Sequence, residues 1–191
     1  MKDFTLYQKI QASFFQSVTT RTAGFFTVPQ ENLSNGSALV SVLLMFIGGS
    51  PVGTAGGIKT VTIAIVVMAA VAAVKNKKDV TMFNRTLSKD AVSKAVAVIC
   101  TSFFIMFIST LLLSAVTDAS FLDILYETAS ATATVGLTRN LTGSLNTIGK
   151  IIIIATMYFG RVGPISLAIA LNLKKQNPNI IKNPVEDISV G

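Results

Sequence analysis

Three long apolar stretches dominate this chain and restrict the folds that it can adopt. They run over residues 37–74, 91–116 and 148–173, and each is long enough to cross a bilayer, which takes about 20 helical residues. Hydrophobic residues make up 51% of the 191 positions and charged residues only 13%, whereas a soluble domain carries about 25% charged residues. The composition therefore predicts an all-α membrane protein.

The charges between these stretches predict an orientation. The segment 75–94 carries six lysines and arginines against two aspartates, and the tail 174–191 adds three lysines. The segment 117–147 has three carboxylates and a single basic residue. Because basic loops stay in the cytoplasm, we expect the basic linker 76–90 and the tail inside and 117–147 outside, in a multi-pass protein of the plasma membrane. The net charge of +7 then reflects topology, and nucleic-acid binding is not expected.

Two runs of small residues interrupt the apolar sequence, SVTTRTAGFF at 17–26 and SATATVGLT at 130–138. Each follows a short helical pattern that is too short to span a membrane, and each precedes a long apolar stretch. An offset of 112 residues aligns the two runs, which predicts a repeat of helix, pore loop and helix resembling that of a potassium channel. The aligned pairs are Phe14 and Tyr126, Thr20 and Thr132, Thr22 and Thr134, Gly24 and Gly136, and Gly48 and Gly160.

Irregular backbone at membrane depth is tolerated only where it is buried in protein or lines water. Glycine permits unusual backbone angles, and carbonyls turned inward can replace the hydration shell of an alkali cation. The two runs therefore predict two parts of a carbonyl-lined filter, although ordinary turns between apolar elements remain an alternative. The candidate filter residues are Thr22, Ala23, Gly24, Phe25, Thr134, Val135, Gly136 and Leu137.

The first apolar stretch is broken by GGSPVGTAGGIKT, residues 48–60. A phosphate-binding loop is rejected, because Ile58 stands where the glycine before Lys59 is required and no strand precedes it. Pro51 and the neighbouring glycines interrupt a helix. A simple kink is the alternative, but we expect a loop of this length to line a cavity and to obstruct ions.

Arg161 lies near the middle of the third stretch, in MYFGRVGPISL. A charge at that depth is costly and usually faces a cavity or a partner. We expect it to bond helix carbonyls, to form an electrostatic barrier in a pore, or to do both by holding the 48–57 loop. On this hypothesis Arg161→Ala raises conductance.

Together, SVTTRTAGF, GGSPVGTAGGIKT, SATATVGLT and YFGRVGPISL resemble the Trk/Ktr/HKT superfamily of potassium transporters, in particular the Ktr-type membrane subunit. The resemblance covers nearly the whole chain. It implies four repeats around one ion path, of which this chain would supply the C-terminal two. Residues 1–75 would hold the pore helix, filter loop and broken second helix of repeat three, and 91–173 would form repeat four.

The resemblance also assigns roles to residues. It implies that backbone carbonyls at Gly24 and Gly136 hold potassium and that Arg161 contacts an intramembrane gate. It also implies that complete subunits form a homodimer and that this homodimer pairs with a cytosolic nucleotide-binding regulatory subunit. Arg139 departs from the family pattern, and we expect it at the outer mouth, where it would weaken cation entry. The gate would consist of Gly53, Thr54, Ala55, Gly56 and Gly57.

These patterns predict potassium uptake by a partial chain. A filter needs loops from four repeats and two are present, so a fragment of a larger transporter is expected. The alternatives are a membrane segment that does not transport, and a sodium-permeable member of the superfamily. An enzyme is not expected, because histidine is absent and the few carboxylates lie at membrane edges. Asp123 and Glu127 are interpreted as a solvated outer face. No bound cofactor is expected, and sodium is a candidate coupling ion.

Overall fold

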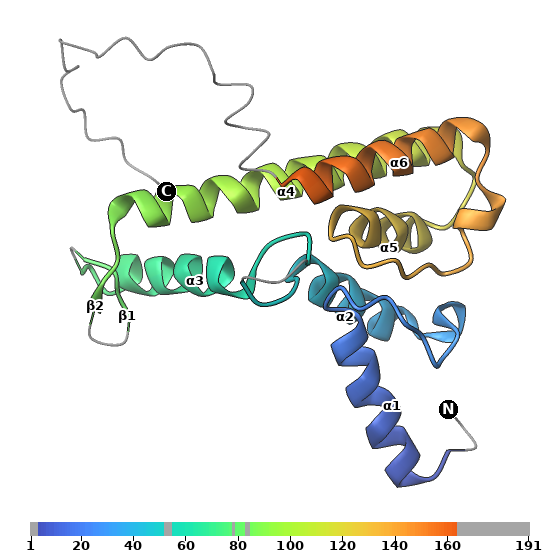
Figure 1. Cartoon of the computed structure of the whole chain (residues 1–191), viewed down its shortest axis with the longest axis horizontal. Coiled ribbons are helices and arrows are strands. Elements are labelled where there is room, and N and C mark those ends of the chain that lie inside the picture. Colours follow the sequence, from blue (N-terminus) through green and yellow to red (C-terminus); the bar gives the residue numbers. More distant parts are fainter. Residues whose placement is uncertain (1–3, 52–54, 78, 83–84, 164–191) are drawn as a thin grey trace.

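The computed structural model describes residues 4–51, 55–77, 79–82 and 85–163. Within these ranges the chain is mostly helical, with one short hairpin between α3 and α4 (Figure 1). The hairpin is a small departure from the expected all-α class. The elements are α1 Leu6–Thr19, α2 Asn35–Phe46, α3 Thr60–Val74, β1 Thr81–Met82, β2 Arg85–Thr86, α4 Lys89–Val116, α5 Phe121–Thr132 and α6 Thr147–Val162.

Five helices begin at a polar residue whose side chain accepts a hydrogen bond from a backbone N–H three residues further on. Such caps satisfy one of the donors left without a partner at a helix start. In α1 the side chain of Gln8 also accepts from the Thr5 N–H, which completes a capping box. The sequence therefore sets where these helices begin. The capping residues are Thr5, Ser34, Ser88, Ser120 and Asn146.

The first apolar stretch forms two short helices rather than one span. The break expected at 48–57 falls between α2 and α3, in a helix-break loop that we define as residues 47–59. Its ends are held together by a parallel bridge between Ile47 and Ile58 and by the Thr60 N–H, which donates to the Gly49 carbonyl at 3.2 Å. The two ends of the loop therefore lie close together, and the break is a loop inserted between two helices and not a simple kink in one helix.

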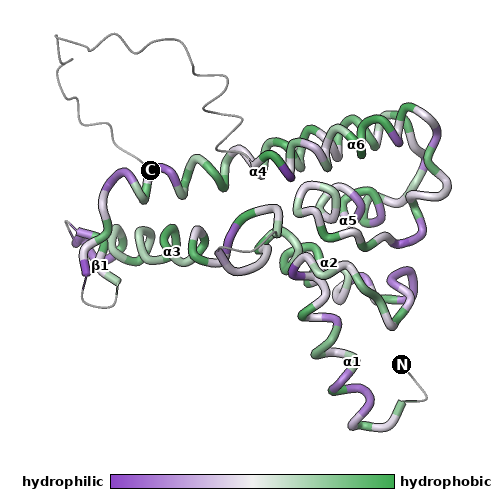
Figure 2. The backbone as a smooth tube through the Cα atoms, in the orientation of Figure 1, coloured by the Kyte–Doolittle hydropathy of each residue, from purple (hydrophilic) through white to green (hydrophobic). Residues whose placement is uncertain are grey.

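Three spans were expected, and within the described residues only α4 has the length and hydropathy to cross a membrane. The glycine-rich break divides the first stretch into α2 and α3, which are too short. Only the first part of the third stretch is described, as α6, and 164–173 lie outside the described residues. Figure 2 shows apolar residues along α4 and α6, with hydrophilic residues gathered at the turn between α3 and α4.

The short helix α5 lies between α2 on one side and α4 and α6 on the other (Figure 1). It packs against α2, α4 and α6, while α3 packs along α4 (Figure 1). Its contact with α4 includes a hydrogen bond between the buried hydroxyls of Thr110 and Thr128 at 2.8 Å, and α6 joins α4 through Thr156 and Ser109 at 2.7 Å. Small hydroxylated residues allow such close helix packing in apolar surroundings.

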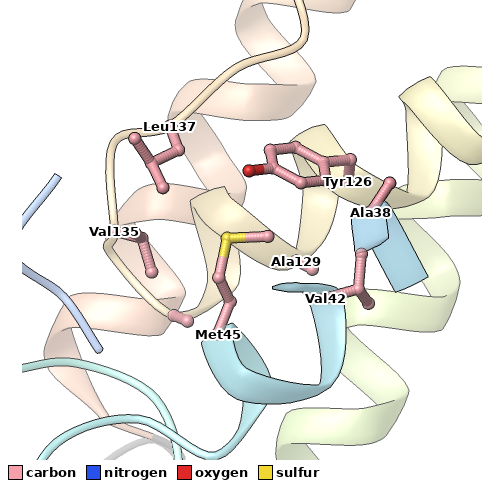
Figure 3. Close-up of a cluster of buried hydrophobic side chains, with 8 residues drawn as sticks. Ala38, Val42, Met45, Tyr126, Ala129, Val135 and Leu137 are labelled. Carbon is pink, nitrogen blue, oxygen red and sulfur yellow. The ribbon is translucent and has the colours of Figure 1, made fainter. Parts of the chain in front are cut away.

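A cluster of apolar side chains anchors α5 and the loop after it to α2 (Figure 3). Val135 and Leu137, in that loop, are 5% and 3% exposed, while Gly136 between them is exposed. The loop therefore buries its side chains on one side and leaves a backbone face free on the other. The cluster consists of Ala38, Val42, Met45, Tyr126, Ala129, Ala133, Val135 and Leu137.

The helices α5 and α6 approach closely at Gly160, where an added Cβ would overlap the backbone carbonyl of Thr132. We expect Gly160→Ala to destabilise the protein by about 1–3 kcal/mol, because backbone atoms cannot move aside as a flexible side chain can. Thermal unfolding of the purified protein in detergent measures the change. Gly143→Ala is the matched control, since nothing lies within 4 Å of a Cβ added there. Equal stability of the two variants would contradict the prediction.

Candidate functional site

The loop that follows α5, residues 133–141, is called the second loop. Four of its consecutive backbone N–H groups donate to the C-terminal end of α5. In a trans peptide the C=O points opposite to the N–H of the following residue, and the described residues contain no cis bond. The carbonyls of residues 133–136 therefore all point away from α5. The bonds are Thr134 N to Ala131 O at 3.1 Å, Val135 N to Ser130 O at 2.9 Å, and Gly136 N and Leu137 N to Ser130 Oγ at 3.2 and 2.9 Å.

Backbone angles explain how these carbonyls share one side. Thr134 and Gly136 have positive φ values of 56° and 92°, and Val135 between them does not. When residues with a left-handed backbone conformation (positive φ) alternate with residues of negative φ, successive peptide groups face the same way. Anion-binding nests use this alternation to make their N–H groups converge. A non-glycine residue with positive φ is uncommon, and such strain gathers at functional sites. No atom lies within 4 Å of a Cβ added at Gly136, so its backbone is open.

The first loop, residues 20–29 after α1, repeats this pattern. Thr22 and Gly24 have φ values of 70° and 76°, at the positions that the 112-residue offset pairs with Thr134 and Gly136. The N–H groups of Ala23 and Gly24 donate to the Thr19 carbonyl at 3.1 and 3.2 Å. The internal repeat inferred from a few identities therefore extends to the backbone conformation.

The two loops approach each other through their backbones. A Cβ added at Gly24 would overlap the carbonyl oxygen of Val135. That carbonyl is one of those directed away from α5, so it faces the first loop. Only glycine fits at Gly24, because the position combines positive φ with this close approach.

The helix-break loop lies directly against both small-residue loops. The Gly56 N–H donates to the Thr134 side-chain oxygen at 3.0 Å, and a Cβ added at Gly49 would lie 3.8 Å from the Thr22 hydroxyl oxygen. Gly57, with φ of 67°, approaches the backbone of Ala133. The structure thus brings the candidate gate residue Gly56 against the candidate filter residue Thr134, and Gly57 against the neighbouring Ala133, while Ala55 lies beside Gly49 in the same helix-break loop.

Two other predicted gate residues, Gly53 and Thr54, lie outside the described residues. Arg161 lies exposed in the last turn of α6, directly after Gly160, the residue in close contact with the end of α5. Its predicted role at the gate remains a prediction.

Arg139, in the second loop, has a structural role that the sequence did not reveal. Its Nε donates to the Asp123 carboxylate at 2.6 Å, and its Nη1 donates to the carbonyls of Gln30 and Leu33 at 3.1 and 3.3 Å. Burial raises the pKa of Asp123, but hydrogen bonds from Ser120 and Arg139 and the charge of Arg139 outweigh it and lower that pKa overall. With its charge compensated, Arg139 ties the second loop to the segment between the first loop and α2.

A second polar contact between the repeats was also missed. The buried Tyr126 hydroxyl donates to the Gln30 side-chain oxygen at 2.8 Å, and Gln16 on α1 donates to the same oxygen at 2.6 Å. Gln30 in turn donates to the Val28 carbonyl at 2.6 Å. The partners lie up to 96 residues apart, so no local sequence pattern predicts this network.

Comparison with known proteins identifies the family. The sequence model of the TrkH family, described as "Cation transport protein", matches residues 1–182. The chain belongs to this family. The members of this family are cation transport proteins and not enzymes.

Several curated relatives share most of this chain. It is 39% identical over 186 residues to the Ktr system potassium uptake protein B of Bacillus subtilis, covering 97% of the chain and 41% of that protein. It is 41% identical over 180 residues to the protein of the same name from Vibrio alginolyticus, covering 94% and 39%. The chain thus spans about two fifths of the length of these relatives.

A further relative and a solved structure agree with this placement. The chain is 34% identical over 192 residues to the potassium/sodium uptake protein NtpJ of Enterococcus hirae, covering 98% of the chain and 43% of that protein. The fold is similar to the crystal structure of the potassium transporter TrkH from Vibrio parahaemolyticus, with a TM-score of 0.77 and 21% identity, over 89% of this chain and 38% of that one. The likeness to the solved structure concerns the fold.

The hydroxyl of Ser130 accepts two of the N–H groups that orient the second loop. We expect Ser130→Ala to lower the free energy of unfolding by about 1–3 kcal/mol, because the buried N–H of Leu137 loses its acceptor. Thermal unfolding in detergent measures the loss. Ser114→Ala on the exposed face of α4 removes a hydroxyl bonded only within its own helix and serves as the control. A Ser130→Ala protein as stable as this control would show that the hydroxyl does not hold the loop.

Proposed function

We propose that this chain supplies two filter loops and an intramembrane gate of a multi-pass potassium uptake transporter in the plasma membrane. One observation carries the proposal: the carbonyls of residues 133–136 point to one side, away from α5, and the Val135 carbonyl among them lies against Gly24 in the first loop, whose backbone repeats the same alternation. Carbonyls arranged in this way can replace the hydration shell of an alkali cation.

On this proposal Thr22–Phe25 and Thr134–Leu137 line the ion path, and carbonyls at Gly24 and Gly136 hold potassium as the transported substrate. The direction of the Gly136 carbonyl supports this role, because the following N–H is bonded to Ser130. Neutral dipoles suit a permeating ion, since binding must be weak enough for the ion to leave.

The names of the relatives favour potassium over other cations. Two of them are potassium uptake proteins. The potassium/sodium uptake protein NtpJ supports a second candidate, permeation or coupling of sodium. Because the chain spans about two fifths of these relatives, we propose that the other two filter loops come from outside this sequence. From the family resemblance, we propose that the two repeats seen here are repeats three and four.

We further propose that the helix-break loop is the gate. The Gly56 N–H bonded to Thr134 places this loop against the second loop, where it can obstruct an ion leaving the filter. Arg161 would stabilise the closed gate. A cytosolic nucleotide-binding regulatory subunit and a homodimer of complete subunits are proposed from the family resemblance, and no bound cofactor is needed.

Rubidium-86 uptake in a bacterium deficient in potassium uptake tests the function. One strain expresses this chain alone, and another expresses a chimaera in which the chain replaces the matching part of the Bacillus subtilis relative. We expect uptake by the chimaera only, because two loops cannot enclose an ion. A chimaera that inserts in the membrane but moves no rubidium would contradict the proposal, and uptake by the chain alone would contradict the fragment interpretation.

The chimaera also tests the filter. Gly136→Ala strains a backbone with φ of 92° without a steric clash, so we expect the protein to fold and to lose most of its potassium uptake and its selectivity over sodium. Gly36→Ala, in α2 with nothing within 4 Å of the added Cβ, is the control and should transport normally. Normal, selective uptake by Gly136→Ala would remove Gly136 from the filter.

The gate proposal predicts that Arg161→Ala in the chimaera increases the maximal rate of rubidium uptake, because an electrostatic barrier and a contact of the closed gate are removed. Lys150→Ala removes a positive charge from the exposed first turns of the same helix and should leave the rate unchanged. An unchanged rate for Arg161→Ala, with equal amounts of protein in the membrane, would exclude the gating role.

A further inference from the structure

Glu127 on α5 is the only charged side chain that is buried within the described part of the chain, at 5% exposure. Its spacing from Asp123 suggested a solvated outer face for both, and for Glu127 that interpretation is wrong. Burying a carboxylate is costly unless it is hydrogen-bonded. Its surroundings therefore need a physical explanation, and the proposed filter and gate do not supply one.

The carboxylate binds the part of the second loop that directly follows the candidate filter residues. The Thr138 hydroxyl donates to one oxygen of Glu127 at 2.6 Å, and the Thr142 hydroxyl donates to the other. Hydrogen bonds to a charged acceptor are about twice as strong as neutral ones. Glu127 thus fixes both ends of the segment 138–142 to α5.

This contact continues the set of bonds that orients the second loop. Glu127 and Ser130 are three residues apart and so lie on one face of α5. Ser130 accepts from the N–H groups of Gly136 and Leu137, and Glu127 accepts from the next residue, Thr138. The same face of α5 therefore holds three consecutive loop residues, with the carboxylate at the outer end.

The charge itself has a second consequence. The ion pair found among the described residues joins Arg139 to Asp123 and leaves Glu127 bonded to neutral hydroxyls. A negative charge that is shielded from water acts over a longer range than a solvated one. It adds a negative potential on the α5 side of the second loop, which favours a cation on the carbonyl side. The helix before the first loop has Phe15 at the equivalent position. A buried carboxylate therefore stands behind the second loop and not behind the first.

We propose that Glu127 is a positioning residue for the ion path: it holds the outer end of the second loop, which sets the preference for potassium over sodium, and it supplies a negative potential behind that loop, which strengthens the binding of either cation. This inference rests on the proposed potassium uptake. It does not require Glu127 to touch the ion.

The test measures rubidium and sodium uptake by the chimaera carrying Glu127→Gln, Glu127→Asp or Thr138→Val. The glutamine variant keeps the size but loses the charge. We expect its KM for rubidium to rise roughly tenfold, because the negative potential behind the bound cation is lost, and its preference over sodium to fall, because the loop is held less firmly. Glu127→Asp keeps the charge and should recover part of the rubidium affinity. Thr138→Val removes a single donor and should shift KM in the same direction by less.

Asp118→Asn, which removes an exposed carboxylate from the loop between α4 and α5, is the matched control and should transport like the parent chimaera. Unchanged KM and selectivity in Glu127→Gln would overturn the inference, as would a lower maximal rate with unchanged selectivity, which is the mark of a merely structural role. If Glu127→Gln does not fold, unchanged selectivity in Thr138→Val overturns it. Failure of the parent chimaera to take up rubidium would instead reject the proposed function.

Discussion

The arrangement of this site depends on the hydrogen bonds by which α5 holds the backbone N–H groups of the loop that follows it. Two of these N–H groups reach the Ser130 hydroxyl and two reach carbonyls at the end of the helix. In a planar trans peptide the C=O points opposite to the N–H, so N–H groups that face α5 make the carbonyls point away from it. The burial of Val135 and Leu137 acts in the same sense, because it anchors the side chains behind the backbone. The second loop thus presents a face of carbonyls that could bind a cation because its N–H groups are hydrogen-bonded to α5.

Glycine allows a close approach at three places where elements of the site meet. Gly24 lets the two small-residue loops approach backbone to backbone, Gly56 lets the helix-break loop bond to Thr134, and Gly160 lets α6 lie against the end of α5. The site is therefore built from contacts that tolerate no side chain. Rearrangement of the helix-break loop would have to break the bond to Thr134, a candidate filter residue, so the proposed gate and filter are mechanically connected.

Much of the local structure could be predicted from the sequence. The short helices, the helix break and the glycine loops follow from apolar patterning and from Gly and Pro, and the 112-residue offset pairs residues that share a backbone conformation. Long-range polar contacts could not be predicted. Glu127 and Asp123 share a helical spacing that is equally typical of a solvated face, and only the folded loop, through Thr138 and Arg139, shows that one is buried and the other paired.

The most direct test of the account is to locate rubidium by anomalous scattering in a crystal structure of the chimaera grown in rubidium chloride. We expect an anomalous peak between the two loops, within coordination distance of the carbonyls of Thr134–Gly136 on one side and of Thr22–Gly24 on the other. An ordered filter region with no peak at that position, or rubidium bound only at side-chain carboxylates elsewhere, would contradict the claim that these loops bind the transported ion through their backbone.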